Sequence, residues 1–261
     1  MEMELLKSFK RWLEDGKPVI GPFMKAVDPA FVECAGHAGF DFVILDMEHG
    51  PAGFPDLQNL IRGAEAAGVL PVVRTYDASE TAIGKALDLG AAGIQVPQVK
   101  SVQEGEDIVR AAKFYPQGER GVCRFVRAAS YSSTPGDRYF REANENLVIM
   151  QVEGAQILEN LDSILKIKGL DILFIGPYDL SQSLGVPGKV GDRKVVDTIK
   201  RINDRARSCG IVTGVFCDTP ESLELWYRAG IRYLSYSVDV GIFTSACRDI
   251  VKISETLCSK D

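Results

Sequence analysis

Short apolar runs alternate with longer stretches of helical periodicity along the chain, and this alternation restricts the fold more than any other feature. Most of the runs are continuous in Val, Ile, Leu and Phe, which is typical of parallel strands that are covered on both faces. The pattern predicts strands at Val19–Met24, Phe40–Asp46, Leu70–Tyr76, Gly93–Val99, Leu147–Glu153, Asp171–Gly176, Val212–Cys217 and Tyr233–Val238.

The stretches between these runs predict helices, and most are followed by a glycine, which suits the left-handed position after a helix. Eight strands that are each followed by a helix, in 261 residues, predict an α/β fold of the (β/α)8 barrel type. A doubly wound open sheet is the alternative, and the even distribution of the units favours the barrel. The predicted helices are one that starts at Asp28-Pro29, then Asp56–Ala67, Ser79–Leu89, Ser101–Phe114, Gln156–Ile167, Lys194–Ser208, Pro220–Ala229 and Gly241–Leu257.

No linker, charge run or low-complexity segment interrupts residues 1–261, so we expect a single domain. One connection, from Tyr115 to Asn146, is long and rich in Arg, Gly and aromatic residues. Structureless loops of this size usually carry a function or an interface.

Composition excludes several classes of protein. The 30 basic and 36 acidic residues give a net charge of −6, whereas nucleic-acid binders usually show a basic excess. No apolar run approaches the ~20 residues of a membrane helix, and the charged N-terminus does not resemble a signal peptide. The six scattered cysteines form no C-x-x-C pair, so we expect reduced thiols in a cytoplasmic protein.

In a (β/α)8 barrel the active site lies at the carboxyl ends of the strands. Two carboxylates, Glu153 and Asp179, follow adjacent predicted strands there. Two oxygen anions with open coordination positions suit a hard divalent cation such as Mg²⁺ or Mn²⁺. The structural alternative is that Asp179 caps the following helix.

Other charged residues follow neighbouring strands. Arg74 ends a strand of buried character and is expected to meet either a substrate carboxylate or enolate, or a structural partner in Asp46 or Glu48. His49 is the natural proton-transfer group, with Asp46 or Asp88 to orient it and Glu48 as a competing base. A cation, an arginine and a histidine together predict chemistry through an enolate.

At these residues the sequence resembles the class II pyruvate aldolases of the HpcH/HpaI family, which include 4-hydroxy-2-oxoheptane-1,7-dioate aldolases and 2-keto-3-deoxy sugar-acid aldolases. The resemblance runs from about Leu5 to Ile253. It implies a TIM barrel of the phosphoenolpyruvate/pyruvate type. Its motifs here are FDFVILDMEHGP, LPVVRTY, KALDLGA, QVPQV, YPQGERGV, VRAASY, MQVEG and LFIGPYDLSQSLG.

The resemblance implies a role for each motif residue. His49 matches the catalytic base, Arg74 the arginine that stabilises the enolate, Asp88 the aspartate that raises the basicity of the histidine, and Asp46 the aspartate beside it. The family's metal ligands match Glu153 and Asp179, and the metal is then Mg²⁺ or Mn²⁺, with Co²⁺ as a further candidate.

The resemblance also implies a substrate pocket. The residues expected to line it are Gln151, Gly176, Pro177, Tyr178, Asp179 and Phe216. Tyr178 and Phe216 depart from the smaller residues common in the family, which predicts a narrower aldehyde pocket. The family forms or cleaves the bond between pyruvate, as its enolate, and an aldehyde in 4-hydroxy-2-oxo acids.

Family members are typically homo-hexamers, built as trimers of dimers that exchange terminal helices, and the segment 241–257 fits this role. The long connection is expected to serve a neighbouring subunit through Arg120, Arg124 or Arg127. Neither nucleic acid nor membrane is expected as a partner.

Three other functions compete with this interpretation. The first is an acyl-CoA lyase of the citrate lyase β or malyl-CoA type, against which the short, acidic chain argues. The second is a Schiff-base aldolase, with Lys25 or Lys100 as the nearest candidate lysines. The third is a barrel that only binds a keto acid.

Overall fold

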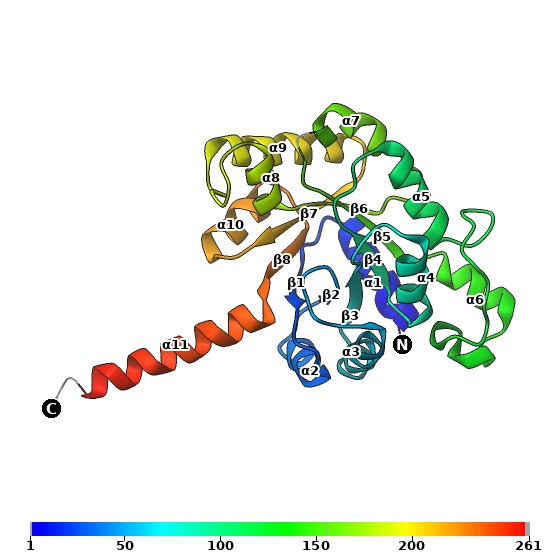
Figure 1. The fold of residues 1–261 in the computed structure, drawn as a ribbon, viewed down its shortest axis with the longest axis horizontal. Coiled ribbons are helices and arrows are strands. Elements are labelled where there is room, and N and C mark those ends of the chain that lie inside the picture. The colour runs from blue at the N-terminus through cyan, green and yellow to red at the C-terminus, as the bar shows by residue number, and fades with distance from the viewer. Residues whose placement is uncertain (1, 155, 259–261) are drawn as a thin grey trace.

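The computed structural model describes residues 2–154 and 156–258, and its eight strands form a closed parallel barrel in sequence order (Figure 1). This confirms the predicted (β/α)8 fold. Three strands have the predicted bounds, and the other five are shorter. The strands are β1 Val19–Met24, β2 Phe42–Asp46, β3 Leu70–Arg74, β4 Gly93–Val96, β5 Leu147–Val152, β6 Ile172–Ile175, β7 Val212–Cys217 and β8 Tyr233–Val238.

The helices begin where side chains satisfy their free amide groups. Asp28, Ser79 and Ser101 each accept a hydrogen bond from the first turn of the helix that follows. Gly68 directly follows the helix Phe54–Ala67 and precedes β3. Its φ of 69° is a left-handed conformation that favours glycine. The helices are α1 Glu2–Glu14, α2 Pro29–His37, α3 Phe54–Ala67, α4 Glu80–Asp88, α5 Val102–Ala112, α6 Gly136–Ala143, α7 Gln156–Ile164, α8 Pro177–Ser183, α9 Arg193–Ser208, α10 Pro220–Arg228 and α11 Asp239–Cys258.

Aromatic side chains close the amino end of the barrel. Phe42 and Tyr233 stack inside it with their ring centroids 4.1 Å apart, and Phe9 of α1 packs edge-on against Phe42 at 5.9 Å. A Cβ at Gly214 would lie 2.7 Å from the Tyr233 ring, so glycine makes room for this layer. With this end sealed by apolar groups, the polar side chains of the barrel gather at the opposite, carboxyl end.

The long connection between α5 and β5 is more ordered than the sequence predicted. It contains a 3₁₀ segment, η1 (Arg127–Ser132), and the helix α6. Phe114, Ala129 and Tyr139 form a small apolar core beneath it. The expectation of a structureless connection was therefore wrong, because aromatic residues in the segment build a local core of their own.

The last helix, α11, projects away from the barrel (Figure 1). Its first residue, Asp239, accepts hydrogen bonds from the backbone amides of Lys25 (3.0 Å) and Ala26 (2.8 Å) after β1. Phe243 contacts Phe31 of α2 at 6.1 Å, and most of the helix beyond that point is exposed. Within the described residues, no helix has the length and apolar character needed to cross a membrane.

Candidate active site

The carboxyl end of the barrel, called the mouth below, brings together most of the predicted site residues. They lie at or just after the carboxyl ends of β2 and β3 on one side and of β5, β6 and β7 on the other. The predicted residues at the mouth are Asp46, His49, Arg74, Gln151, Glu153, Gly176, Pro177, Tyr178, Asp179 and Phe216.

Arg74 and Asp46 face each other as register partners at the ends of β3 and β2. The guanidinium donates two hydrogen bonds to the Asp46 carboxylate, from Nε at 2.9 Å and from Nη2 at 2.8 Å. Its Nη1 lies 3.0 Å from an oxygen of Glu48. Burial alone would raise the pKa of Asp46, but the hydrogen bonds and charge of Arg74 hold that pKa below its ordinary value. Both structural partners considered for Arg74 are thus present.

Two further groups complete the environment of this ion pair. The guanidinium of Arg74 lies over the ring of Phe23, 4.5 Å from its centroid, in a cation–π contact. Lys25 brings a second cation to within 3.9 Å of the Asp46 carboxylate. Arg74 is therefore held in one orientation by contacts on its edges and on its face.

His49 lies at the mouth with 58% of its side chain exposed, open to a substrate or to water. Asp46 accepts a hydrogen bond from its backbone amide at 3.2 Å, which fixes the turn after β2 and leaves the imidazole free. Glu48 Oε2 lies 3.9 Å from its Nε2. Asp46 therefore positions the backbone of His49, and this contact does not orient the ring.

Asp88 lies at the other end of the barrel. It is the last residue of α4, which leads into the start of β4, whereas His49 follows the end of β2. Its carboxylate pairs with the buried Arg120 at 2.8 Å. Within one chain, the structure does not bring Asp88 to His49, and the helix–turn–strand connection is the reason.

Glu153 follows β5 at the end of a row of buried amides. Gln95 donates a 2.6 Å hydrogen bond to Gln151, and Gln151 donates one to Glu153. Burial, followed by the charges of Asp179 and Glu48, raises the pKa of Glu153 to about 7, although the hydrogen bond from Gln151 and the charge of Arg74 act in the opposite direction. A buried carboxylate whose neighbours are anionic is in a position that a cation would stabilise.

The strand end beside Glu153 leaves room for its carboxylate. A Cβ at Gly176 would lie 3.0 Å from Glu153 Cγ and 3.1 Å from its Oε1. Gly176 also occupies the N-cap of α8, so Asp179 lies inside the first turn of that helix and does not cap it. Asp179 is exposed, and its carboxylate has no hydrogen-bond partner in the described chain.

The two carboxylates fit a hard divalent cation. Both offer oxygen ligands, and Glu153 is buried without a fully compensating cation. In residues 2–154 and 156–258, no three His, Cys, Asp or Glu side chains are grouped to hold a metal ion. A cation at this pair would therefore take its remaining ligands from water and substrate oxygens.

One wall of the mouth is aromatic, and Arg74 lies at one end of it, over the ring of Phe23. Phe216, near the end of β7, lies 5.9 Å from Phe23 and 6.1 Å from Tyr178, measured between ring centroids. The Tyr178 hydroxyl donates a hydrogen bond to Asp218, and this bond, followed by burial, raises the pKa of Tyr178 to about 12. The sequence analysis did not select Asp218, although its place directly after β7 is a signal that could have found it.

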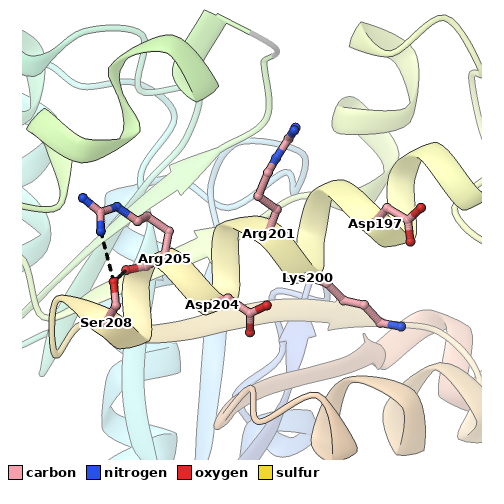
Figure 2. A pocket seen from close by; sticks show the side chains of 6 residues that line it. All are labelled: Asp197, Lys200, Arg201, Asp204, Arg205 and Ser208. Atoms are coloured by element: carbon pink, nitrogen blue, oxygen red, sulfur yellow. Dashed lines mark hydrogen bonds between the residues drawn. The ribbon is translucent and has the colours of Figure 1, made fainter.

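Two hollows, larger than a third one along α11 in the described part of the chain, lie away from the mouth. One, of about 520 Å³, lies along the outer side of α9, where charged side chains spread along one helix (Figure 2). The other, of about 630 Å³, lies at the amino ends of β3 and β4 against α1 and α6. Neither includes Glu153, Asp179 or Arg74.

The fold and this mouth agree with the comparisons to known proteins. The family described as HpcH/HpaI aldolase/citrate lyase matches residues 20–246, and the chain belongs to this family. It is a class II pyruvate aldolase, and hence a carbon–carbon lyase.

Individual relatives cover nearly the whole chain. A 2-keto-3-deoxy-L-rhamnonate aldolase of Salmonella gallinarum is 33% identical over 248 residues, 94% of this chain and 92% of the relative. A family protein of Burkholderia cenocepacia J2315 superposes with a TM-score of 0.90 at 29% identity, covering 95% of this chain and 99% of that one. The citrate synthase SbnG gives 0.86 at 31% identity, covering 96% and 98%.

The alternative of an acyl-CoA lyase finds weaker support. A citrate lyase β subunit of Mycobacterium tuberculosis superposes with a TM-score of 0.58 at 18% identity, which shows a shared fold alone. The aldolases are the nearer relatives by both measures.

Proposed function

We propose that this aldolase uses a divalent cation held by Glu153 and Asp179 to join pyruvate to an aldehyde, or to reverse that reaction. The observation that carries the proposal is the buried Glu153, whose neighbouring charges include Asp179 and Glu48. Gly176 gives its carboxylate the space it occupies. A cation bound there would polarise the keto oxygen of pyruvate and make its methyl protons more acidic.

The residues around the cation site divide the remaining work. We assign to His49 the removal of the methyl proton, because its imidazole is exposed at the mouth and an imidazole nitrogen can accept a proton. Arg74, fixed by Asp46 and Glu48, keeps N–H groups on Nη1 and Nη2 that can donate to the enolate oxygen. Gln151 is held by Gln95 and positions Glu153.

The lysines at the mouth favour this mechanism over a Schiff base. Lys25 is paired with Asp46 at 3.9 Å, and Lys100 is exposed. A Schiff-base lysine needs a desolvated site, whereas the side chains of both lysines are open to solvent. The named Salmonella relative supports a 2-keto-3-deoxy sugar acid as the substrate class, and we propose that class for this chain.

We also propose a homo-oligomer in the cytoplasm, with the hexamer as the expected form. The support is α11, whose exposed apolar residues include Ile250, Val251 and Ile253. Arg120 and Arg127 are paired with Asp88 and Glu65 of the same chain, so Arg124 is the arginine of the long connection best placed for a neighbour. Sedimentation as a monomer at micromolar concentration would contradict this assembly.

The test is the exchange of pyruvate methyl protons in D₂O, followed by NMR with Mg²⁺, Mn²⁺, Co²⁺ or EDTA and without any aldehyde. We expect metal-dependent exchange that is lost in His49→Ala. Exchange that persists in EDTA, with an adduct trapped by borohydride, would establish the Schiff-base mechanism instead. No exchange with any metal would overturn the proposal and leave the thioester lyase and the binding-only barrel to be tested.

A further inference from the structure

Tyr178 and Asp218 form a polar pair on the rim of the mouth. Tyr178 belongs to the first turn of α8, and Asp218 directly follows β7, the strand next to β6 in the barrel. The tyrosine hydroxyl donates its hydrogen bond to Oδ2 of Asp218. Both residues are exposed, so the pair is open to a molecule that enters the mouth.

A row of contacts connects this pair to the enolate-binding arginine. The guanidinium of Arg74 lies on Phe23, Phe23 contacts Phe216, and Phe216 contacts Tyr178. The row gives the mouth a continuous wall with a cation at one end and Asp218 at the other. An aldehyde that reacts with an enolate bound near Arg74 and Glu153 would have this wall beside it, with Asp218 at the far end.

The two ends of the wall differ in how their charges are balanced. The cations of Lys25 and Arg74 lie beside the carboxylates of Asp46 and Glu48 at one end. At the other end, Asp218 forms no ion pair with any Lys, Arg or His in the described residues. Its Oδ1 has no hydrogen-bond partner there, and the oxygen of Tyr178 keeps its lone pairs for a donor. This end of the wall presents hydrogen-bond acceptors to hydroxyl groups, and its negative charge repels an anion.

We propose that the Tyr178–Asp218 pair selects the acceptor aldehyde, taking aldehydes that carry hydroxyl groups and rejecting those that carry a carboxylate. The inference rests on the proposed function, because an acceptor is needed only if pyruvate is the nucleophile. It assigns a role to Asp218, whose carboxylate repels a like charge while it accepts hydrogen bonds from neutral hydroxyls.

Glyceraldehyde and tartronate semialdehyde provide a matched test, because they differ only by a terminal CH₂OH or carboxylate. In the wild type we expect kcat/KM to favour glyceraldehyde by about tenfold or more, and we expect added salt to narrow the difference. Asp218→Asn should lower this selectivity about tenfold, with little dependence on salt. Tyr178→Phe keeps the ring on Phe216 and should lower kcat/KM for glyceraldehyde several-fold.

Asp197→Asn is the control for the change in net charge. Asp197 lies on the outer side of α9 (Figure 2), and this variant should keep the wild-type selectivity. Pyruvate exchange without aldehyde is measured in every variant. Its absence from the wild type would reject the proposed function, whereas exchange with unchanged selectivity in Asp218→Asn would reject the role of the pair. A wild-type preference for tartronate semialdehyde would also reject it.

Discussion

Arg74 holds Asp46 by two hydrogen bonds of 2.9 and 2.8 Å between adjacent strand ends. The pair is nearly inaccessible to solvent, and the same aspartate accepts the backbone amides of Glu48 and His49. The Asp46 carboxylate thus fixes both the guanidinium group of Arg74 and the turn that carries His49. Arg74 and His49 are for this reason structurally coupled.

Asp46→Ala should destabilise the protein strongly, because it leaves the Arg74 cation buried without its closest partner. Breaking a buried pair by removing one member costs about 3–5 kcal/mol. Urea denaturation should show this loss in the free energy of unfolding. Asp162→Ala is the control, since Asp162 pairs with Arg205 at the surface and its removal should change stability little. A similar small loss in both variants would contradict the coupling.

Metal binding should depend on pH through Glu153. Its pKa in the metal-free protein is raised to about 7, so the proton competes with the cation below that pH. Mn²⁺ affinity should fall about tenfold per pH unit below 7 and level off above it, as titration calorimetry would show. Without metal, the raised pKa of Glu153 affects stability in the opposite direction. The protonated carboxyl is favoured by folding, so its contribution to the free energy of unfolding is present at low pH and is lost as the pH rises through 7. A flat affinity profile from pH 5 to 8 would argue against Glu153 as a ligand.

Gly176→Ala should weaken the cation site by displacing Glu153. The added methyl group would meet the Glu153 side chain at 3.0 to 3.1 Å, although the backbone φ of −86° accepts alanine. We expect a loss of metal affinity of about 10- to 100-fold, the range found when groups that support metal ligands are changed. Gly191→Ala is the matched control, because nothing lies within 4 Å of its added Cβ. Equal metal affinity in the two variants would show that the carboxylate does not need this space.

Cys217 should resist alkylation in the folded protein. Burial at the end of β7, followed by the charge of Asp218, raises the pKa of its thiol to about 12, and the thiolate is the reactive form. Cys34, Cys123, Cys209 and Cys247 are exposed and should react with iodoacetamide at pH 8. Peptide mapping by mass spectrometry should find Cys217 labelled only after denaturation. Its labelling in the native state would mean that the mouth opens further than the structure shows.

The strands could be predicted from the sequence because each is a continuous apolar run between turn residues. The location of the strand-end residues could also be predicted, because the parallel strands of a barrel place their carboxyl ends at one mouth. Glu153 and Asp179 follow from this rule alone. The order of the long connection did not follow, because its core needs Phe114 and Tyr139, which are distant in sequence.

The pairwise contacts across the mouth also could not be predicted from the sequence. Arg74 had two expected kinds of partner, and only the register of β2 and β3 shows that Asp46 takes both hydrogen bonds. Asp218 stands 40 residues from Tyr178, so their pairing depends on how β6 and β7 lie side by side. For Asp88, the motif predicted a place beside His49, but a motif does not say at which end of the barrel its residue lies.

The hydrogen bonds of Asp239 connect α11 to the rim of the mouth. This residue begins the projecting helix, and its carboxylate holds the backbone of Lys25 and Ala26, while the ammonium group of Lys25 lies beside Asp46. The start of α11 and the loop that borders the Arg74 ion pair are therefore anchored to the same carboxylate. A neighbouring molecule that packs against the exposed part of α11 would thus contact a helix whose first residue supports the rim of the mouth.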